Sequence, residues 1–140
     1  MTVGPERPVA YVLDRQGLLD YATEASLVVP SLLAAARERD RRIAVSALAV
    51  GEAYLHSNGE DADRLDLLAG GDLATLLLVA AFDKAAAREV GRGRDAASGE
   101  RDLARLHMAA LAREHDAIVV TGQEGPMRDL LGPDWTIMEL

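Results

Sequence analysis

The chain has 140 residues, of which 49% are hydrophobic and 27% are charged, a balance typical of globular proteins and not of disordered ones. It contains no cysteine, which excludes disulfides, thiolate zinc sites and catalysis by a thiol. The formal net charge of −8 disfavours indiscriminate binding to nucleic acid, although a bound metal ion can reverse the charge of a local site.

The first eight residues and the apolar runs bear on where in the cell the protein is expected. Residues 1–8 lack the basic-then-apolar pattern of a secretory signal. No window reaches the roughly 18 uninterrupted apolar residues of a membrane span. We therefore expect one soluble, cytoplasmic domain over residues 1–140.

Apolar runs of strand length alternate with helical patterns from one end of the chain to the other. In the first half, the pattern predicts in order a strand at 9–13, a helix at 16–21, a helix opening at Pro30, a strand at 43–48, and helices at 50–56 and 61–68. In the second half it predicts a strand at 74–79, a helix from Asp83 to Val90, a flexible basic loop at 91–94, a helix at 99–114, a strand at 117–121, a helix around 127–131 and a strand at 135–140. This alternation predicts a three-layer α/β/α sandwich with a central, mostly parallel sheet of about five strands.

Acidic residues recur next to the predicted strands. Asp14 directly follows the first strand, Glu52 lies in the helix after the second, and Asp102 opens the helix that leads into the fourth. Taken singly, they are ordinary: a helix cap, a solvated helix residue and a first-turn acid favoured by the helix dipole. Ligands of parallel sheets bind outside the carboxyl ends of the strands. Because clustered carboxylates repel one another unless they share a cation, their common edge predicts a divalent-metal site.

These motifs, in this order, resemble the PIN-domain family, the metal-dependent ribonuclease fold of VapC-like toxins, over essentially the whole chain. Tyr11-Val12-Leu13-Asp14 is similar to the family's opening strand with its first acid. Segments 47–53 and 102–112 are similar to the helices that carry its second and third acids, and Val119-Val120-Thr121 to the strand whose threonine precedes the fourth.

One position departs from the family pattern. Two residues beyond Thr121, where the family has its fourth acid, the chain has Gln123, whose neutral carbonyl is a weaker ligand for a hard cation than a carboxylate. The next residue, Glu124, is an acid, and the direction of its helix decides whether its side chain points into the site or away from it. Thr121 itself is either a group that orients the site or an ordinary residue at a strand end.

The resemblance implies a Mg²⁺- or Mn²⁺-dependent endoribonuclease in which Asp14, Glu52 and Asp102 are the metal ligands and catalytic acids. The cation would activate a water and neutralise charge on the phosphate. The resemblance also implies an RNA substrate, a homodimer and, for the toxin of a type II toxin–antitoxin pair, a small antitoxin that blocks the acidic cleft. Gln123 motivates the alternative, a catalytically inactive or weakened PIN-like module that binds RNA or a protein partner.

Two other signals lack the context that their chemistry needs. Segment 91–96 reads G-x-G-x-x-A, but it follows a predicted helix and not a strand, as dinucleotide binding requires. His56, His107 and His115 have no paired zinc spacing, and we expect His107 to be a packed or surface residue.

A phosphoacceptor receiver domain is also disfavoured. That class has paired acids after its first strand and a lysine after its last core strand, whereas here Asp14 stands alone and Lys84 lies in a predicted helix. The arginines near 37–42 and 88–94 belong either to solvated surfaces or to contacts with an RNA backbone.

Overall fold

The computed structural model describes residues 7–71, 73 and 75–140. Five strands form one sheet in the order β3-β2-β1-β4-β5, and each neighbouring pair is parallel. The strands are β1 (Val9–Leu13), β2 (Arg42–Ser46), β3 (Leu77–Ala80), β4 (Ile118–Thr121) and β5 (Ile137–Glu139). The predicted α/β class with a central parallel sheet is therefore confirmed.

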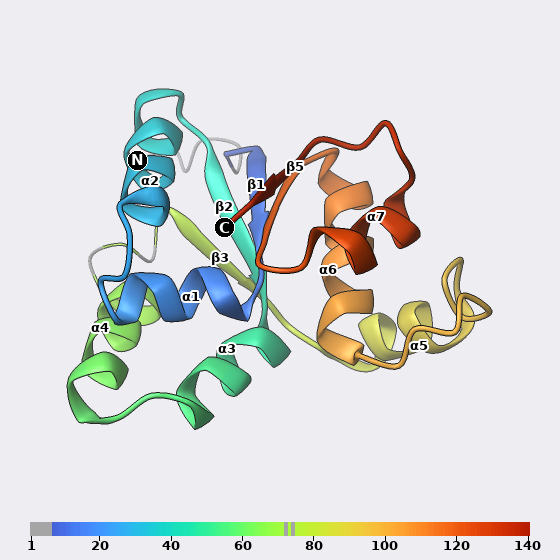
Figure 1. Ribbon diagram of the computed structural model, residues 1–140, viewed down its shortest axis with the longest axis horizontal. Helices are drawn as coiled ribbons and strands as arrows, with labels where there is room; N and C mark the ends of the chain where they lie inside the picture. The colour runs from blue at the N-terminus through green and yellow to red at the C-terminus, as the bar shows by residue number, and fades with distance from the viewer. Residues whose placement is uncertain (1–6, 72, 74) are drawn as a thin grey trace, which may run out of the picture.

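Helices cover both faces of the sheet (Figure 1). One face carries α1 (Arg15–Ala22), α2 (Val28–Glu38), α3 (Ala47–Leu55) and α4 (Gly59–Gly70); the other carries α5 (Lys84–Arg92), α6 (Leu103–His115) and α7 (Glu124–Leu131). The strands read as continuous apolar runs because their alternate side chains enter opposite cores. Leu13 and Val45 pack under the first set of helices, whereas Val12 and Ala44 pack under the second.

The second strand is shorter than predicted, and the helix after it is longer. The side chain of Ser46 accepts a hydrogen bond from the backbone N–H of Leu48 at 3.1 Å, which caps α3 directly at the end of β2. Ala47 and Leu48 are consequently helical and not extended, as the prediction had them. Glu52 thus lies in the middle of α3, and not just inside its start.

The longest helix begins later than its apolar spacing suggested. Asp102 is the N-cap of α6, because its carboxylate accepts from the backbone N–H of Arg105 at 3.1 Å. The residues at 99–101 therefore lie outside the helix that was predicted to include them. The basic loop predicted at 91–94 is also partly helical, since α5 continues through Arg92.

Other boundaries moved for local reasons. The helix predicted from Pro30 begins at Val28, since a proline is tolerated in the first turn, where N–H groups have no helical acceptor. The helix around 127–131 starts at Glu124, and the last strand is confined to β5. The third strand starts at Leu77; Ala74, its predicted first residue, lies outside the described residues. Among the helices that the structure describes, none is long and apolar enough to cross a bilayer.

Two leucines of α4 provide a test of the packing. Leu65 is 2% exposed and Leu67 is 58% exposed. We expect Leu65→Ala to lower the free energy of unfolding by about 2–5 kcal/mol, because it removes buried methyl groups and leaves a cavity. Leu67→Ala, on the same helix, should change it by no more than about 0.5 kcal/mol. Urea denaturation of both variants measures the difference, and equal losses would contradict the packing.

Candidate functional site

The candidate site lies where the strand order of the sheet reverses. From β1 the chain adds β2 and β3 on one side, and later adds β4 and β5 on the other. The connections that leave β1 and β4 lead to helices on opposite faces, which opens a crevice at the carboxyl ends of these strands. A cavity of about 120 Å³ occupies this place, with room for a few water molecules at roughly 30 Å³ each. Its polar lining includes Asp14, Arg15, Glu52, Asp102, Arg105 and Gln123.

The carboxylate of Asp14 joins the ends of the two central strands. Its Oδ1 accepts from the backbone N–H of Gly17 at 2.9 Å and so caps α1. Its Oδ2 accepts from the hydroxyl of Thr121 at 2.7 Å and from the backbone N–H of Gly122 at 2.9 Å. Asp14 is therefore both a helix cap and a link between β1 and β4.

The hydroxyl of Thr121 orients its surroundings. This side chain is 2% exposed, donates to Asp14, and accepts from the backbone N–H of Gln123 at 3.0 Å. One hydroxyl thus sets both the rotation of the Asp14 carboxylate and the start of the turn that leads into α7.

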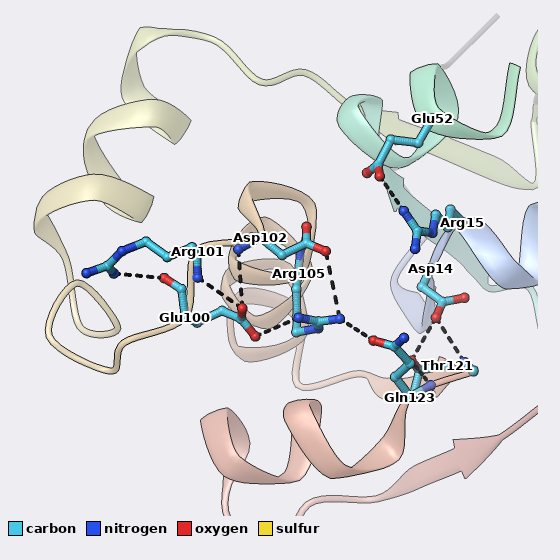
Figure 2. Close-up of polar contacts among 10 residues, drawn as sticks. Asp14, Arg15, Glu52, Glu100, Arg101, Asp102, Arg105, Thr121 and Gln123 are labelled. Carbon is cyan, nitrogen blue, oxygen red and sulfur yellow. Dashed lines mark hydrogen bonds and ion pairs between the residues drawn. The ribbon is translucent and has the colours of Figure 1, made fainter. Parts of the chain in front are cut away.

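Glu52 reaches the cavity from α3 and is paired with an arginine. Its Oε2 lies 2.7 Å from Nη1 of Arg15, the first residue of α1, and Figure 2 shows these two side chains pointing toward one another beside Asp14. Both side chains are partly exposed, at 43% for Arg15 and 32% for Glu52. An ion pair this accessible to water contributes about 0–1 kcal/mol, so its effect is mainly on the charge of the cavity.

Asp102 is also accompanied by an arginine, and this one is more buried. The Arg105 side chain is 19% exposed, and its Nη2 lies 3.7 Å from Oδ2 of Asp102. Its Nη1 donates to Oε1 of Glu100 at 2.8 Å, and its Nη2 donates to the side-chain oxygen of Gln123. In Figure 2 the Arg105 guanidinium lies between the two acids and the glutamine.

Glu100 anchors this arrangement. Burial by itself raises the pKa of its carboxyl, but hydrogen bonds from Arg105 and from the backbone N–H groups of Asp102 and Arg101, with the charge of Arg105, outweigh burial and hold the pKa below its usual value. Glu100 is therefore a carboxylate that keeps Arg105 beside the cavity.

The arginines and Glu100 were absent from the residues that the sequence singled out. The two arginines could have been found from their spacing to the acids, which a search for acids alone does not use. Arg15 directly follows Asp14, and Arg105 lies three residues beyond Asp102, a spacing that brings the two onto neighbouring positions of a helix.

Gln123 and Glu124 face in different directions. Gln123 lines the cavity, and its side-chain oxygen accepts from Arg105. Glu124 begins α7, and its Oε1 lies 2.9 Å from Nη2 of Arg128 one helical turn further on. Glu124 is not among the residues that line the cavity, so it turns along its own helix.

Asp14, Glu52 and Asp102 share one cavity, but they are not arranged as a set of metal ligands. Among the residues that the structure describes, no three acidic or histidine side chains form a group that could hold a metal ion. The oxygen donors suit Mg²⁺ or Mn²⁺ by their chemistry. Their arrangement does not fit it, because two of the carboxylates have an arginine beside them and the third accepts three hydrogen bonds within the protein.

His107 is packed behind the cavity. It is 4% exposed, its ring meets that of Phe82 edge-on at 5.2 Å, and its Nδ1 lies 2.6 Å from the hydroxyl oxygen of Ser46. Burial lowers the pKa of the imidazole, and the charges of Asp83 and Glu114 oppose this only in part. Because the Ser46 oxygen already accepts from Leu48, its hydroxyl proton is free to bond to a neutral His107.

The likeness of this chain to known proteins is found in its structure and not in its sequence. No model of a protein family matches the sequence, and no curated protein matches it either. Among solved structures, this chain is similar to a chain in the structure of VapBC2 from Rickettsia felis, which is bound to a promoter DNA fragment. The TM-score is 0.66 and the identity is 16%, and the match covers 94% of this chain and 98% of that one.

Two further structures have the same fold. A chain of FitAcB from Neisseria gonorrhoeae matches with a TM-score of 0.60 and 21% identity over 92% of this chain and 96% of that one. A chain of FitAB bound to an IR36 DNA fragment matches with a TM-score of 0.58 and 18% identity, covering 92% and 94%. The chain has a PIN-like fold. At identities this low, the likeness establishes the fold and not the activity.

The link between the strand ends can be tested at Thr121. Thr121→Val keeps the shape of the side chain but leaves Asp14 without one donor and Gln123 N–H without its acceptor. We expect a loss of about 1–3 kcal/mol in the free energy of unfolding. Thr121→Ser retains the hydroxyl and should lose clearly less; denaturant titration of both variants compares them, and equal losses would show that the hydroxyl is unimportant.

The buried imidazole should make stability depend on pH. The pKa of His107 is lower in the folded protein than the value of about 6.5 that it has when unfolded. The unfolded chain therefore binds the proton more readily, so stability is fully present above this pH and falls as the pH drops below it. Denaturation at several pH values should show that His107→Gln reduces this fall. An identical pH profile for the variant and the wild type would contradict the assignment.

Proposed function

We propose that this protein is a metal-dependent endoribonuclease of the PIN type and the toxin of a type II toxin–antitoxin pair. The observation that supports this most directly is the gathering of Asp14, Glu52 and Asp102 from distant segments into one cavity at the switch point of a PIN-like fold. The structural neighbours named VapBC2 and FitAB belong to such complexes, which supports the same proposal.

In this proposal the three acids supply oxygen ligands to Mg²⁺ or Mn²⁺, and the substrate is the phosphodiester backbone of RNA. An acidic cavity in a chain of net charge −8 repels a phosphate. A divalent cation reverses that local charge, so cleavage should require the cation. The carboxylate of Asp14 is the most firmly oriented of the three, because Thr121 and two backbone N–H groups donate to it.

The partners belong to the same proposal. We propose a small antitoxin partner, since the similar chains come from complexes whose names, VapBC2 and FitAB, join two components. The proposed homodimer rests on the resemblance to the PIN-domain family alone. A cytoplasmic location also remains a prediction.

A second candidate function is a PIN-like module that binds RNA or a protein partner and does not cut. The observations that favour it are Gln123 in the position of the fourth acid and the arginines beside Glu52 and Asp102. Calorimetry separates the two candidates, because Mn²⁺ binding that is lost in Asp102→Ala argues against a dead site.

The activity can be tested with Asp14→Asn. We expect the wild type to cleave RNA, assayed on total cellular RNA during a Mn²⁺ titration into the millimolar range, and to be inactive with excess chelator. Asp14→Asn should lose at least about 100-fold in rate, because a neutral amide replaces a proposed metal ligand.

The matched control is Asp20→Asn, which makes the same change of charge. Asp20 lies on α1 and does not line the cavity, and its carboxylate accepts only from the exposed side chain of Gln16 among the contacts described. The Asp20→Asn variant should cleave RNA like the wild type, and thermal melting should confirm that both variants fold. A wild type that leaves RNA intact at every Mn²⁺ concentration would contradict the proposed nuclease.

A further inference from the structure

We propose that Arg105 is a built-in cation of the acidic cavity, and that its guanidinium beside Asp102 is the reason why the residues present do not fit a divalent metal. This inference rests on the proposed function, since it concerns how the same site takes up its metal. Carboxylate oxygens line the cavity, but Nη2 of Arg105 already lies 3.7 Å from Oδ2 of Asp102, one of these acids.

The first support is the way in which the guanidinium is held. Arg105 lines the cavity, and its two terminal nitrogens face oxygens of Glu100, Asp102 and Gln123. These acceptors come from two separate segments, the approach to α6 and the turn after β4 (Figure 2). A guanidinium with acceptors on both sides is oriented, and not a surface charge that happens to be near.

The second support is charge. Arginine stays protonated at any physiological pH, so the positive charge beside Asp102 is permanent. The side chain is only 19% exposed, and water therefore screens it less than it screens a surface charge. A divalent cation at Asp102 would meet this charge at short range, so its affinity should be low while the guanidinium stays there.

The third support is that the two acids that hold Arg105 lie differently relative to the cavity. Asp102 lines the cavity, whereas Glu100 does not. The Glu100 carboxylate accepts from Nη1 of Arg105 at 2.8 Å and therefore holds the arginine without itself offering an oxygen to the cavity. It keeps the arginine next to Asp102.

The fourth support is the residue that departs from the family pattern. Gln123 is a poor ligand for Mg²⁺ or Mn²⁺, but its neutral side-chain oxygen is a good acceptor for a guanidinium. Its oxygen accepts from Arg105. The substitution that weakens the metal site is therefore the one that supplies a partner to the competing arginine.

Arg15 is the other arginine of the cavity, and its side chain is more than twice as exposed. Its pair with Glu52 is accessible to water and is correspondingly easier to break. Arg105 is therefore the residue to test.

The test is direct metal binding, with no need for activity. Mn²⁺ is titrated by calorimetry into the wild type and Arg105→Gln, and melting curves confirm folding. We expect Arg105→Gln to bind Mn²⁺ at least about tenfold more tightly, because the nearby positive charge is gone, and to lose this gain when Asp102→Ala is added. Should Arg105→Gln fail to fold, Arg105→Met keeps the apolar stem of the side chain and removes the same charge.

Two controls separate this effect from general charge. Arg101→Gln makes the same change of net charge on the loop that leads into α6, but the Arg101 guanidinium contacts only the backbone oxygen of Glu100 among the contacts described, and Figure 2 shows it pointing away from Asp14 and Glu52. Arg105→Lys keeps the charge in place. Both should bind Mn²⁺ as weakly as the wild type.

The outcomes are distinguishable from those of the nuclease assay. Equal Mn²⁺ affinity in Arg105→Gln and wild type overturns the role of Arg105, even if the wild type cleaves RNA. A tenfold gain that depends on Asp102 supports that role even if none of the proteins cleaves RNA, in which case only the proposed nuclease fails. An equal gain in Arg101→Gln also overturns the inference, since the effect would then be one of net charge.

Discussion

The carboxylate of Asp14 connects β1 and β4, the two strands between which the strand order of the sheet reverses. It caps the helix that leaves β1, and it accepts from the side chain of Thr121 and the backbone of Gly122 at the end of β4. The hydrogen bond from Thr121 joins residues 107 positions apart in the sequence and adds a side-chain contact to the parallel ladder between the two strands. The cavity lies at this link, since Asp14, Thr121 and Gly122 all line it.

Helix capping concentrates polar chemistry at the same edge. In a parallel α/β sheet each strand is followed by a helix, so the capping side chains collect at the carboxyl ends of the strands. Asp14 caps α1, Ser46 caps α3, and Asp102 caps the helix that leads into β4. The structural and functional interpretations of an acid at such a position are therefore not exclusive, because the oxygen that does not cap the helix contacts other groups of the site: Oδ2 of Asp14 contacts Thr121 and Gly122, and Oδ2 of Asp102 lies near Arg105.

Arginines change what this collection of acids can do. Carboxylates alone would repel one another and favour a shared cation, but Glu52 and Asp102 each have a guanidinium within 4 Å in this structure. The cavity therefore carries much of its own counter-charge. Glu100 and Gln123 matter mainly because they hold one of these guanidinium groups in place.

The sequence predicted the elements well where apolar runs are long and less well where side chains decide the boundary. The strand at 9–13 is reproduced by β1, since its burial on both faces leaves a continuous apolar signal. The carboxyl end of β2 and the start of α6 were misplaced, because the single hydrogen bonds of Ser46 and Asp102 decide where each helix begins. No periodicity of hydrophobic residues reports such a bond.

The candidate site divides in the same way. The order of residues alone placed Asp14, Glu52, Asp102 and Gln123 at one edge of a parallel sheet, since that follows from strand and helix order, and all four line the cavity. Only the tertiary structure decided which side chains pair across it: Arg15 with Glu52, Arg105 with Glu100 and Gln123, and Glu124 with Arg128 away from it. The reason is physical. Chain order determines where a backbone position lies in the sheet, whereas the direction of a long charged side chain depends on which opposite charges the folded chain brings within its reach.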